Sequence, residues 1–318
     1  MSVRSFLLTL AFSMAIVSPV SASPDCDFDF QCCLNHRNND NHYDEYGLKT
    51  VAFSPVTVSL FDQFLLSPAV YTVNPPVAIW VPATKVADSP YDAIVGPTVV
   101  APVNPDLHYV RYPIKLSGEL KLPYDSRKDV FVFTEFGPVT LKLSVPQFVM
   151  IPAFEYESVG DVPIGGPPPS GYNNYICYSA MPANFMDGRG EPVHMQDRFL
   201  QNQSLTHVVA SRLLCVPTER KGASAGDCSK VADIDLSYLC YDVEEALVVP
   251  DVPHYINDQF LSQYDRSVEV PSPNRYAAAV SIASRGDNLV CAPARVVQSY
   301  RNVLYSAAHR DPNALCGP

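Results

Sequence analysis

The chain has 318 residues and a formal net charge of −11, with 33 acidic against 22 basic residues. Binding of nucleic acid needs a basic surface, so the acidic balance predicts that nucleic acid is not a partner. Thirty prolines against fourteen glycines disfavour long helices and are tolerated at strand ends, edges and turns.

Residues 1–22 have the features of a secretory signal peptide. Arg4 provides the positive start, Phe6 to Val17 form a mostly apolar run, and Val20-Ser21-Ala22 is a small-residue cleavage site. The apolar run is too short to remain as a membrane anchor. We therefore expect a secreted protein, extracellular or periplasmic, without a membrane span. Removal of the signal takes away Arg4 and changes the formal charge to −12.

Residues 23–41 form a polar, cysteine-bearing segment rich in Asn and Asp. Oxygen-bearing side chains concentrate from Asn38 to Glu45, and Asp40, Asp44 and Glu45 are weak candidate ligands for Ca²⁺. The stretch lacks the glycine and the terminal Glu spacing of an EF-hand, so a solvated loop is the favoured interpretation. No cofactor and no metal are predicted.

A three-part skeleton recurs four times from residue 42 onward. It consists of a Tyr-x-x-Tyr motif, a polar triplet that ends in Phe, and a motif that closes with Pro. The opening motifs begin at Tyr43, Tyr109, Tyr175 and Tyr238, which are 66, 66 and 63 residues apart. Self-similarity at a fixed period predicts a copied supersecondary unit. The triplets end at Phe64, Phe136, Phe199 and Phe260, and the closing motifs end at Pro82, Pro152, Pro217 and Pro293.

The residues between these motifs favour β-strands. Thr140 to Val145 alternates apolar and polar side chains at period two, as a half-buried strand does. The predicted fold is all-β, an antiparallel sandwich or barrel built from four repeats of about 65 residues. One C-terminal helix is also predicted, because apolar residues from Ala294 to Ala308 recur at helical spacing.

A proline-rich and glycine-rich linker, residues 160–171, separates repeats 2 and 3. The predicted division is therefore residues 42–159 with repeats 1 and 2, and residues 172–318 with repeats 3 and 4 and the C-terminal helix. Each domain is expected to consist of two related units that complete each other's core.

The nine cysteines predict a set of disulfides. In repeats 3 and 4, one Cys stands in the Tyr motif and another stands two residues before the Pro, whereas repeats 1 and 2 lack both. Paired presence and paired absence predict the bonds Cys177 to Cys215 and Cys240 to Cys291. Cys228 and Cys316 would attach the C-terminus to the fold. Cys26, Cys32 and Cys33 would then contain one bond and one remaining thiol.

No motif for a known catalytic site is present. The chain has neither Gly-x-Ser-x-Gly nor His-Glu-x-x-His, and no two histidines lie at the i, i+4 spacing of zinc ligands. The recurring acids Asp62, Asp197 and Asp258 are interpreted as residues that cap turns. In each Tyr motif, one Tyr is expected in the core and the other with its hydroxyl tethered to the backbone. An aromatic ladder that stacks sugars is the alternative.

The motifs Tyr175 to Tyr178, Asp197 to Phe199 and Leu214 to Pro217 resemble a family of secreted β-repeat modules of uncharacterised function. Such modules occur in tandem in exported bacterial and archaeal proteins, and the resemblance extends over residues 42–293. It implies no catalytic residues.

The sequence therefore favours a non-enzymatic extracellular protein with a structural or interaction role, one that self-assembles at the cell surface. Its partner would be itself or another extracellular protein. The alternative is a carbohydrate-binding protein that uses exposed aromatic residues such as Trp80, with a glycan as ligand. A secreted hydrolase with a dispersed site is the third hypothesis.

Overall fold

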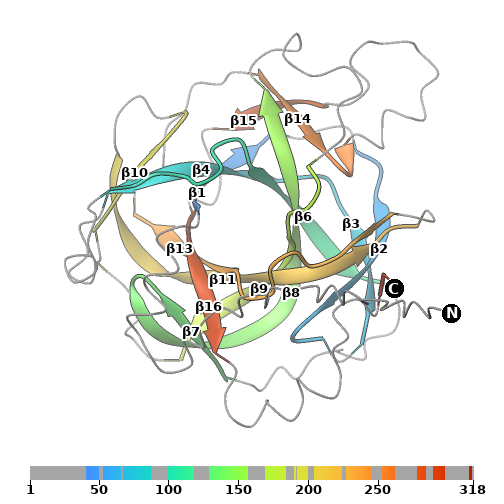
Figure 1. Cartoon of the computed structure of the whole chain (residues 1–318), viewed down its shortest axis with the longest axis horizontal. Coiled ribbons are helices and arrows are strands. Elements are labelled where there is room, and N and C mark those ends of the chain that lie inside the picture. The colour runs from blue at the N-terminus through green and yellow to red at the C-terminus, as the bar shows by residue number, and fades with distance from the viewer. Residues whose placement is uncertain are drawn as a thin grey trace, which may run out of the picture.

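The structure is a computed structural model that describes residues 41–49, 53–65, 67–86, 99–117, 129–156, 169–183, 190, 192–199, 204–223, 227–244, 253–261, 278–283, 289–297 and 315–316. In these residues the chain forms one connected β-sheet in which all strand pairs are antiparallel (Figure 1). The sixteen strands are β1 (His42–Leu48), β2 (Val56–Asp62), β3 (Ala69–Val73), β4 (Ala78–Val86), β5 (Val99–Val100), β6 (His108–Leu116), β7 (Asp129–Thr134), β8 (Gly137–Tyr156), β9 (Asn174–Pro182), β10 (Pro192–Asp197), β11 (Ser204–Lys221), β12 (Cys228–Ser229), β13 (Ser237–Val243), β14 (Pro253–Asp258), β15 (Ala278–Ala283) and β16 (Leu289–Val297).

The opening and closing motifs of each predicted repeat pair with each other in one common register. We name the four stretches that they bound segment 1 (residues 42–86), segment 2 (108–156), segment 3 (174–221) and segment 4 (237–297). In each segment the first Tyr of the opening motif lies opposite the Pro of the closing motif. The four pairs are Tyr43 with Pro82 (β1 and β4), Tyr109 with Pro152 (β6 and β8), Tyr175 with Pro217 (β9 and β11), and Tyr238 with Pro293 (β13 and β16).

Neighbouring segments also pair with one another, and segment 4 returns to segment 1. Strand β4 pairs with β6, β8 with β9, β11 with β13, and β16 with β1. In each case the residue two before the Pro lies opposite the first Tyr of the next segment. These pairs are Trp80 with Tyr109, Met150 with Tyr175, Cys215 with Tyr238, and Cys291 with Tyr43.

The resulting sheet is ring-like and is neither a sandwich nor a true barrel (Figure 1). Strands β8 and β11, of 20 and 18 residues, each pair with strands of the ring along one part of their length. Along another part β8 pairs with β7, and β11 pairs with β10. Neither β7 nor β10 belongs to the ring, which consists of the strands that carry the Tyr and Pro motifs: β1, β4, β6, β8, β9, β11, β13 and β16. The sequence predicted antiparallel strands correctly, but the closure of strands around a ring depends on pairings between distant segments.

The strand that leads into each polar triplet pairs with the segment after next. Asp62 at the end of β2 lies opposite Thr218 of β11, and Asp197 at the end of β10 lies opposite Ala83 of β4. Strand β14 pairs with β8 in the same way, and β7 pairs with β16. Segments 1 and 3, and segments 2 and 4, are therefore interlocked by reciprocal strand pairing.

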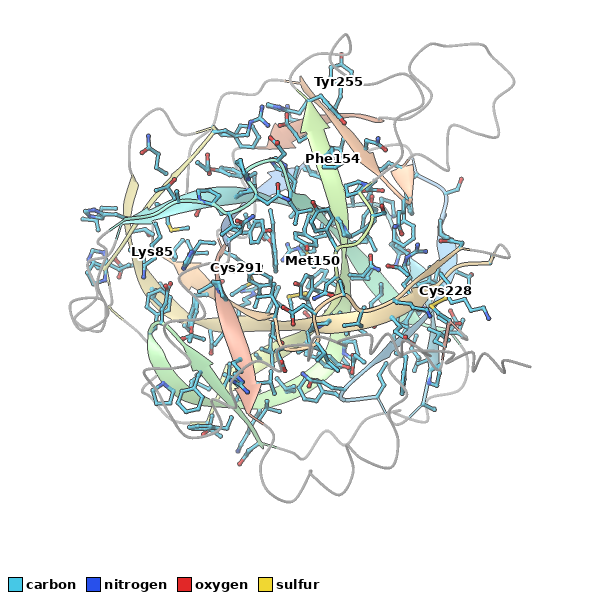
Figure 2. All side chains as sticks on the ribbon, viewed as in Figure 1. Lys85, Met150, Phe154, Cys228, Tyr255 and Cys291 are labelled. Carbon is cyan, nitrogen blue, oxygen red and sulfur yellow. A yellow bond between two sulfur atoms is a disulfide. The ribbon has the colours of Figure 1, made fainter. Side chains whose placement is uncertain are left out.

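The side chains form two buried clusters. The centre of the ring is filled by the first Tyr of each segment, by Trp80 and Met150, and by the cysteines of two disulfides. Figure 2 shows Met150 and Cys291 inside the ring. The second and larger cluster contains the second Tyr of each segment together with Val, Ile and Leu side chains from most strands. Alternation of side chains along each strand assigns neighbouring residues of the Tyr motif to different clusters.

One sequence prediction differs from the structure. The predicted helix from Ala294 is wrong at its start, because residues 294–297 continue β16 and pair with β7; residues 298–308 lie outside the described residues. Strands from both predicted domains belong to one sheet, in which β8 pairs with β9 and β16 pairs with β1. The signal peptide, residues 23–40 and most of the linker lie outside the described residues.

Candidate functional site

The four first tyrosines form a closed aromatic ring inside the sheet. Each ring lies edge-to-face against the next one, with centroids separated by 5.6 Å (Tyr43 and Tyr109), 5.4 Å (Tyr109 and Tyr175), 5.3 Å (Tyr175 and Tyr238) and 5.4 Å (Tyr238 and Tyr43). This geometry places the positive edge of one ring against the negative face of another. All four side chains are at most 3% exposed, so they are core residues and no surface ladder for sugars.

The hydroxyl of each second Tyr is held by a side chain in the polar triplet of the segment after next, where the sequence predicted a bond to the backbone. Tyr178 donates to Asp62 Oδ2 at 2.7 Å, and Tyr112 donates to Asp258 Oδ2 at 2.5 Å. Tyr46 contacts Asp197 in the same way, and Tyr241 lies 2.9 Å from Thr134 Oγ1. Because both partners are buried in every pair, these contacts join segments that are remote in the sequence.

The same acids cap the turn that follows them, as the sequence predicted. Asp62 Oδ1 accepts the backbone N–H groups of Phe64 and Leu65, at 2.5 and 3.0 Å. Asp258 Oδ1 accepts those of Phe260 and Leu261, at 2.7 and 2.8 Å. Burial raises the pKa of Asp258 to about 6, although the bonds from Tyr112 and the backbone oppose this rise.

The described residues contain three disulfides: Cys177–Cys215, Cys240–Cys291 and Cys228–Cys316. They are the pairs expected from the sequence. The first two lie in the ring interior and are 0% exposed. Disulfides of this number indicate an oxidising compartment, extracellular or periplasmic in character.

In segments 1 and 2, polar contacts occupy the place of these two bonds. Glu45 lies opposite Trp80 in the register of Cys177 and Cys215, and its Oε2 accepts the indole N–H at 2.8 Å. Glu45 Oε1 lies 3.2 Å from Nη2 of Arg111, which is the residue of segment 2 at the same motif position. Arg111 in turn stacks over Phe148 at 4.4 Å. A buried ion pair therefore joins the two segments that lack an internal disulfide.

The candidate ligand residue Trp80 is fully buried, so its assignment as an exposed sugar platform is wrong. It occupies an inward position of the closing motif, in the cluster at the centre of the ring that also contains Met150, Cys215 and Cys291. The Ca²⁺ candidates Asp44 and Glu45 belong to different clusters, since Glu45 faces Trp80 and Asp44 lies beside Asp197. Asp40 lies outside the described residues. Among the residues described, no group of three or more His, Cys, Asp or Glu side chains is arranged to hold a metal ion.

A second set of buried charges joins neighbouring segments. Glu135 Oε2 lies 2.8 Å from His42 Nε2 and 2.8 Å from Lys85 Nζ. Burial opposes ionisation of Glu135, but the positive charges of His42 and Lys85 lower its pKa well below the ordinary value. His108 occupies the same motif position as His42, but its Nδ1 lies 3.0 Å from the Asp106 carbonyl. Burial lowers the pKa of His108 to about 4.

Another group of buried polar residues lies around the turn at Asp197. We name this group the polar corner; its members are Asp44, Tyr46, Glu155, Asp197, Arg198 and His254. Glu155 contacts His254 Nδ1 and Arg198 Nη1, both at 2.5 Å. Phe199 lies between the two halves of the corner, with ring contacts to Tyr46 at 5.3 Å and to His254 at 4.8 Å. Burial raises the pKa of Asp44 and of Tyr46, and buried groups with perturbed pKa values mark a candidate functional site.

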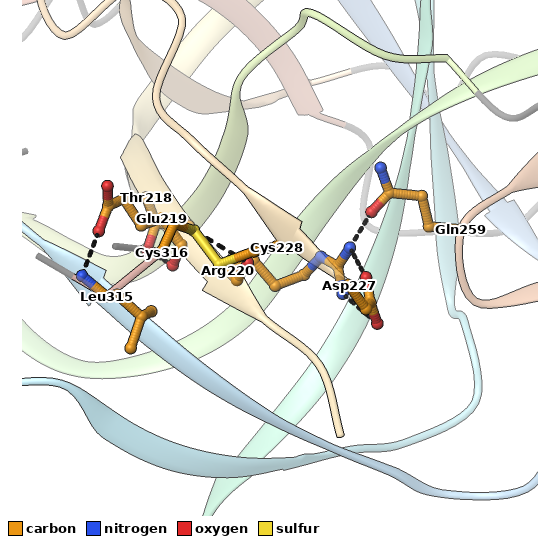
Figure 3. Close-up of a disulfide and its surroundings, with 8 residues drawn as sticks. All are labelled: Thr218, Glu219, Arg220, Asp227, Cys228, Gln259, Leu315 and Cys316. Atoms are coloured by element: carbon orange, nitrogen blue, oxygen red, sulfur yellow. Dashed lines mark hydrogen bonds and ion pairs between the residues drawn. A yellow bond between two sulfur atoms is a disulfide. The ribbon is translucent and has the colours of Figure 1, made fainter. Parts of the chain in front are cut away.

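The C-terminus is attached near a second polar group, shown in Figure 3. Cys316 bonds to Cys228, and Leu315 donates its backbone N–H to Glu219 Oε2 at 3.2 Å. Arg220, only 1% exposed, forms two hydrogen bonds with Asp227, at 2.7 and 3.2 Å. A shallow pocket whose lining includes Phe61, Glu219 and Ile234 lies at the same place.

The residues of the polar corner were not assigned together from the sequence. A signal was available, because Asp44 and His254 stand at positions where the other segments carry apolar residues. Their convergence depends on pairing between segments 1 and 3 and between segments 2 and 4. No helix in the described parts of the chain is long and apolar enough to cross a membrane.

Comparison with known proteins identifies no relative: no family model, no curated protein and no solved structure matches the chain.

Proposed function

We propose that this chain is a secreted, non-enzymatic structural or interaction protein, built from four copies of one unit and able to associate with itself at the cell surface. The observation that carries the proposal is the use of the recurring polar residues. The tyrosines and acids of the motifs hold one segment against another and are buried. Residues that form buried internal contacts make the fold rigid and are not accessible to a substrate.

The four-copy origin is supported by the common register. The first Tyr faces the Pro in every segment, and the residue two before the Pro faces the next Tyr in every junction. The proposed relationship to secreted β-repeat modules depends on these same motifs. Four unrelated stretches would have no reason to adopt one register.

Self-association would use side-chain faces and not strand edges. Each of the fourteen longer strands pairs with at least two others among the described residues. A sheet without long free edges offers little for another strand to join. The outer face of β7, β8 and β9 is a suitable contact surface, because Phe131 on β7 is 37% exposed and Met181 on β9 is 61% exposed.

Light scattering across a concentration series of the mature, oxidised protein tests the proposal. We expect the molar mass to rise above that of the monomer, and Phe131→Ser to reduce the rise. Val209→Ser, at an exposed valine on β11, is the matched control. A constant monomer mass at high concentration would contradict self-association. A fall in molar mass after reduction would show that a cysteine outside the three disulfides described above forms the contact between chains.

Carbohydrate binding is the second candidate, and one observation favours it. Phe131 and Phe133 form an aromatic pair on β7, with ring centroids 5.0 Å apart and Phe131 partly exposed. An exposed aromatic ring can stack on a sugar. A glycan array probed with the native protein and with Phe131→Ala tests this candidate, and an array signal that Phe131→Ala leaves unchanged would exclude Phe131 as the platform.

A further inference from the structure

Asp44 is an acid at a position built for an apolar side chain. It is the second residue of the first Tyr motif, and the same position holds Val110, Ile176 and Leu239 in the other segments. All four residues are 0% exposed. Neither carboxyl oxygen of Asp44 has a hydrogen-bond donor among the described residues. An ionised carboxylate in such a place is strongly disfavoured, because burial removes its hydration and nothing replaces it.

The titratable neighbours of Asp44 are acids. Asp44 lies opposite Val81 of β4 and Val290 of β16, which are apolar. From β10, Asp197 reaches the same place beside Ala83, and Tyr46 of β1 hydrogen-bonds to Asp197. The basic side chains on these four strands are His42 of β1, Lys85 of β4, His194 of β10 and Arg295 of β16. Of these, His42 and Lys85 are engaged by Glu135 at 2.8 Å.

Asp197 cannot form a hydrogen bond with Asp44 while both carboxyl groups are ionised. Asp197 Oδ1 already accepts the backbone N–H of Phe199 at 2.6 Å, and its Oδ2 accepts the Tyr46 hydroxyl. A carboxylate is an acceptor only, so two ionised carboxyls repel each other. One proton on the pair changes this, because a protonated Asp44 can donate to Asp197.

The junction of segments 2 and 4 provides a natural comparison. There Asp258 accepts from Tyr112 and caps its turn as Asp197 does, but the residue beside it is Val110. The second acid is therefore unnecessary for holding the triplet and the Tyr together. Asp44, the second acid, is present only at the contact of Asp197 with Tyr46, between segments 1 and 3. This contact therefore contains a pair of neighbouring carboxyl groups, which the equivalent contacts lack.

We infer that Asp44 and Asp197 share one proton and form an acid-stabilised lock between segments 1 and 3, which loosens when this proton is lost. Burial first, and then the charge of Asp197, raise the pKa of Asp44 well above its ordinary value. The stabilisation by the lock is complete below the unfolded pKa of Asp, about 3.9, and is lost as pH rises through the raised pKa. The lock acts within one chain, so its failure would leave the proposed self-association untouched.

Comparison of variants isolates the lock from other titrations. His108, with a pKa of about 4, and Asp258, with a pKa of about 6, also change charge between acid and neutral pH, in opposite senses for stability. We would measure urea unfolding of the full mature chain at pH 5 and pH 8 for the native protein and for Asp44→Leu, which installs the residue of segment 4. Between these pH values, the folding constant of the native protein should fall by about tenfold or more relative to Asp44→Leu.

Two further variants test the chemistry of the pair. Asp44→Asn keeps the shape of the side chain and donates to Asp197 without a titrating proton, so it should lose the same pH dependence. Val110→Asp places a second acid beside Asp258 and should create a new loss of stability toward high pH. Equal pH dependence in the native protein and Asp44→Leu would overturn the lock. If Asp44→Leu does not fold, a ¹³C carboxyl titration of the native protein decides, and an ordinary pKa for both Asp44 and Asp197 would overturn it.

Discussion

Trp80 donates its indole N–H to Glu45 at 2.8 Å in the register that Cys215 and Cys177 occupy as a disulfide. The same site in the fold is therefore cross-linked covalently in segment 3 and by polar contacts in segment 1. Arg111 of segment 2 extends the contact to the neighbouring segment through Glu45. The ring interior therefore contains both a disulfide and a set of polar contacts at equivalent positions.

Removal of Glu45 should destabilise the protein strongly. Glu45→Ala leaves the guanidinium of Arg111, whose side chain is 5% exposed, without its carboxylate and removes the acceptor of Trp80. Breaking a buried pair from one side costs about 3–5 kcal/mol in the free energy of unfolding. Chemical denaturation of the oxidised protein measures this loss.

The conservative variant separates charge from hydrogen bonding. Glu45→Gln keeps an acceptor for Trp80 and removes the charge that faces Arg111, so its loss should be smaller than that of Glu45→Ala. A loss below about 1 kcal/mol for Glu45→Ala would show that the ion pair has no structural role, since it would be no greater than a surface pair.

The three disulfides should differ in their resistance to reduction. Cys228 and Cys316 are partly exposed, whereas the cysteines of the other two bonds are 0% exposed. A thiolate must reach the sulfur that it attacks, so mild thiol reductant should open Cys228–Cys316 first. Alkylation followed by mass spectrometry measures the order. Early labelling of Cys177 or Cys291 under native conditions would contradict the buried positions.

The contact between Asp62 and Tyr178 should show energetic coupling. Asp62→Ala removes the acceptor of two backbone N–H groups and of the Tyr178 hydroxyl, and should cost about 3 kcal/mol. Tyr178→Phe should cost about 1 kcal/mol. The double variant should cost less than the sum of the two, because both changes remove one shared bond. Strict additivity in a double-mutant cycle would contradict a direct contact between Asp62 and Tyr178.

Glu135 should stabilise the fold above acid pH. Its pKa is lowered by His42 and Lys85 against the effect of burial, so the stabilisation is present above the unfolded pKa of Glu, about 4.3, and is lost as pH falls below it. Glu135→Gln should therefore flatten the decline in stability below about pH 4. Thermal unfolding from pH 2 to pH 6 measures the profile. An unchanged acid decline in Glu135→Gln would contradict this role.

Local features of the fold could be predicted from the sequence. Short-range patterns identified the strands, the capping acids and the pairs Cys177–Cys215 and Cys240–Cys291, because each of these depends on residue type and spacing within one segment. The predicted helix after Ala294 failed for a physical reason. Val296 lies in β16, where pairing with Val132 of β7 outweighs a helical spacing of apolar residues.

Contacts between segments could not be predicted in this way. Tyr178 and Asp62 are 116 residues apart, and no local pattern specifies that the triplet of segment 1 binds the Tyr of segment 3. Trp80 was misassigned because a single aromatic residue carries no sign of which face it occupies. Asp44 was grouped with Glu45 as a ligand, although neighbouring residues in a strand point to opposite sides.

Disulfide mapping under non-reducing conditions tests the common register most directly. In each of the four segments the Tyr motif pairs with the Pro motif. If this register is correct, mapping must find peptides that link Cys177 to Cys215 and Cys240 to Cys291. We predict these two linked peptides together with one that joins Cys228 to Cys316. A peptide that links Cys177 or Cys240 to any other cysteine would contradict the register and, with it, the interlocked arrangement of the four segments.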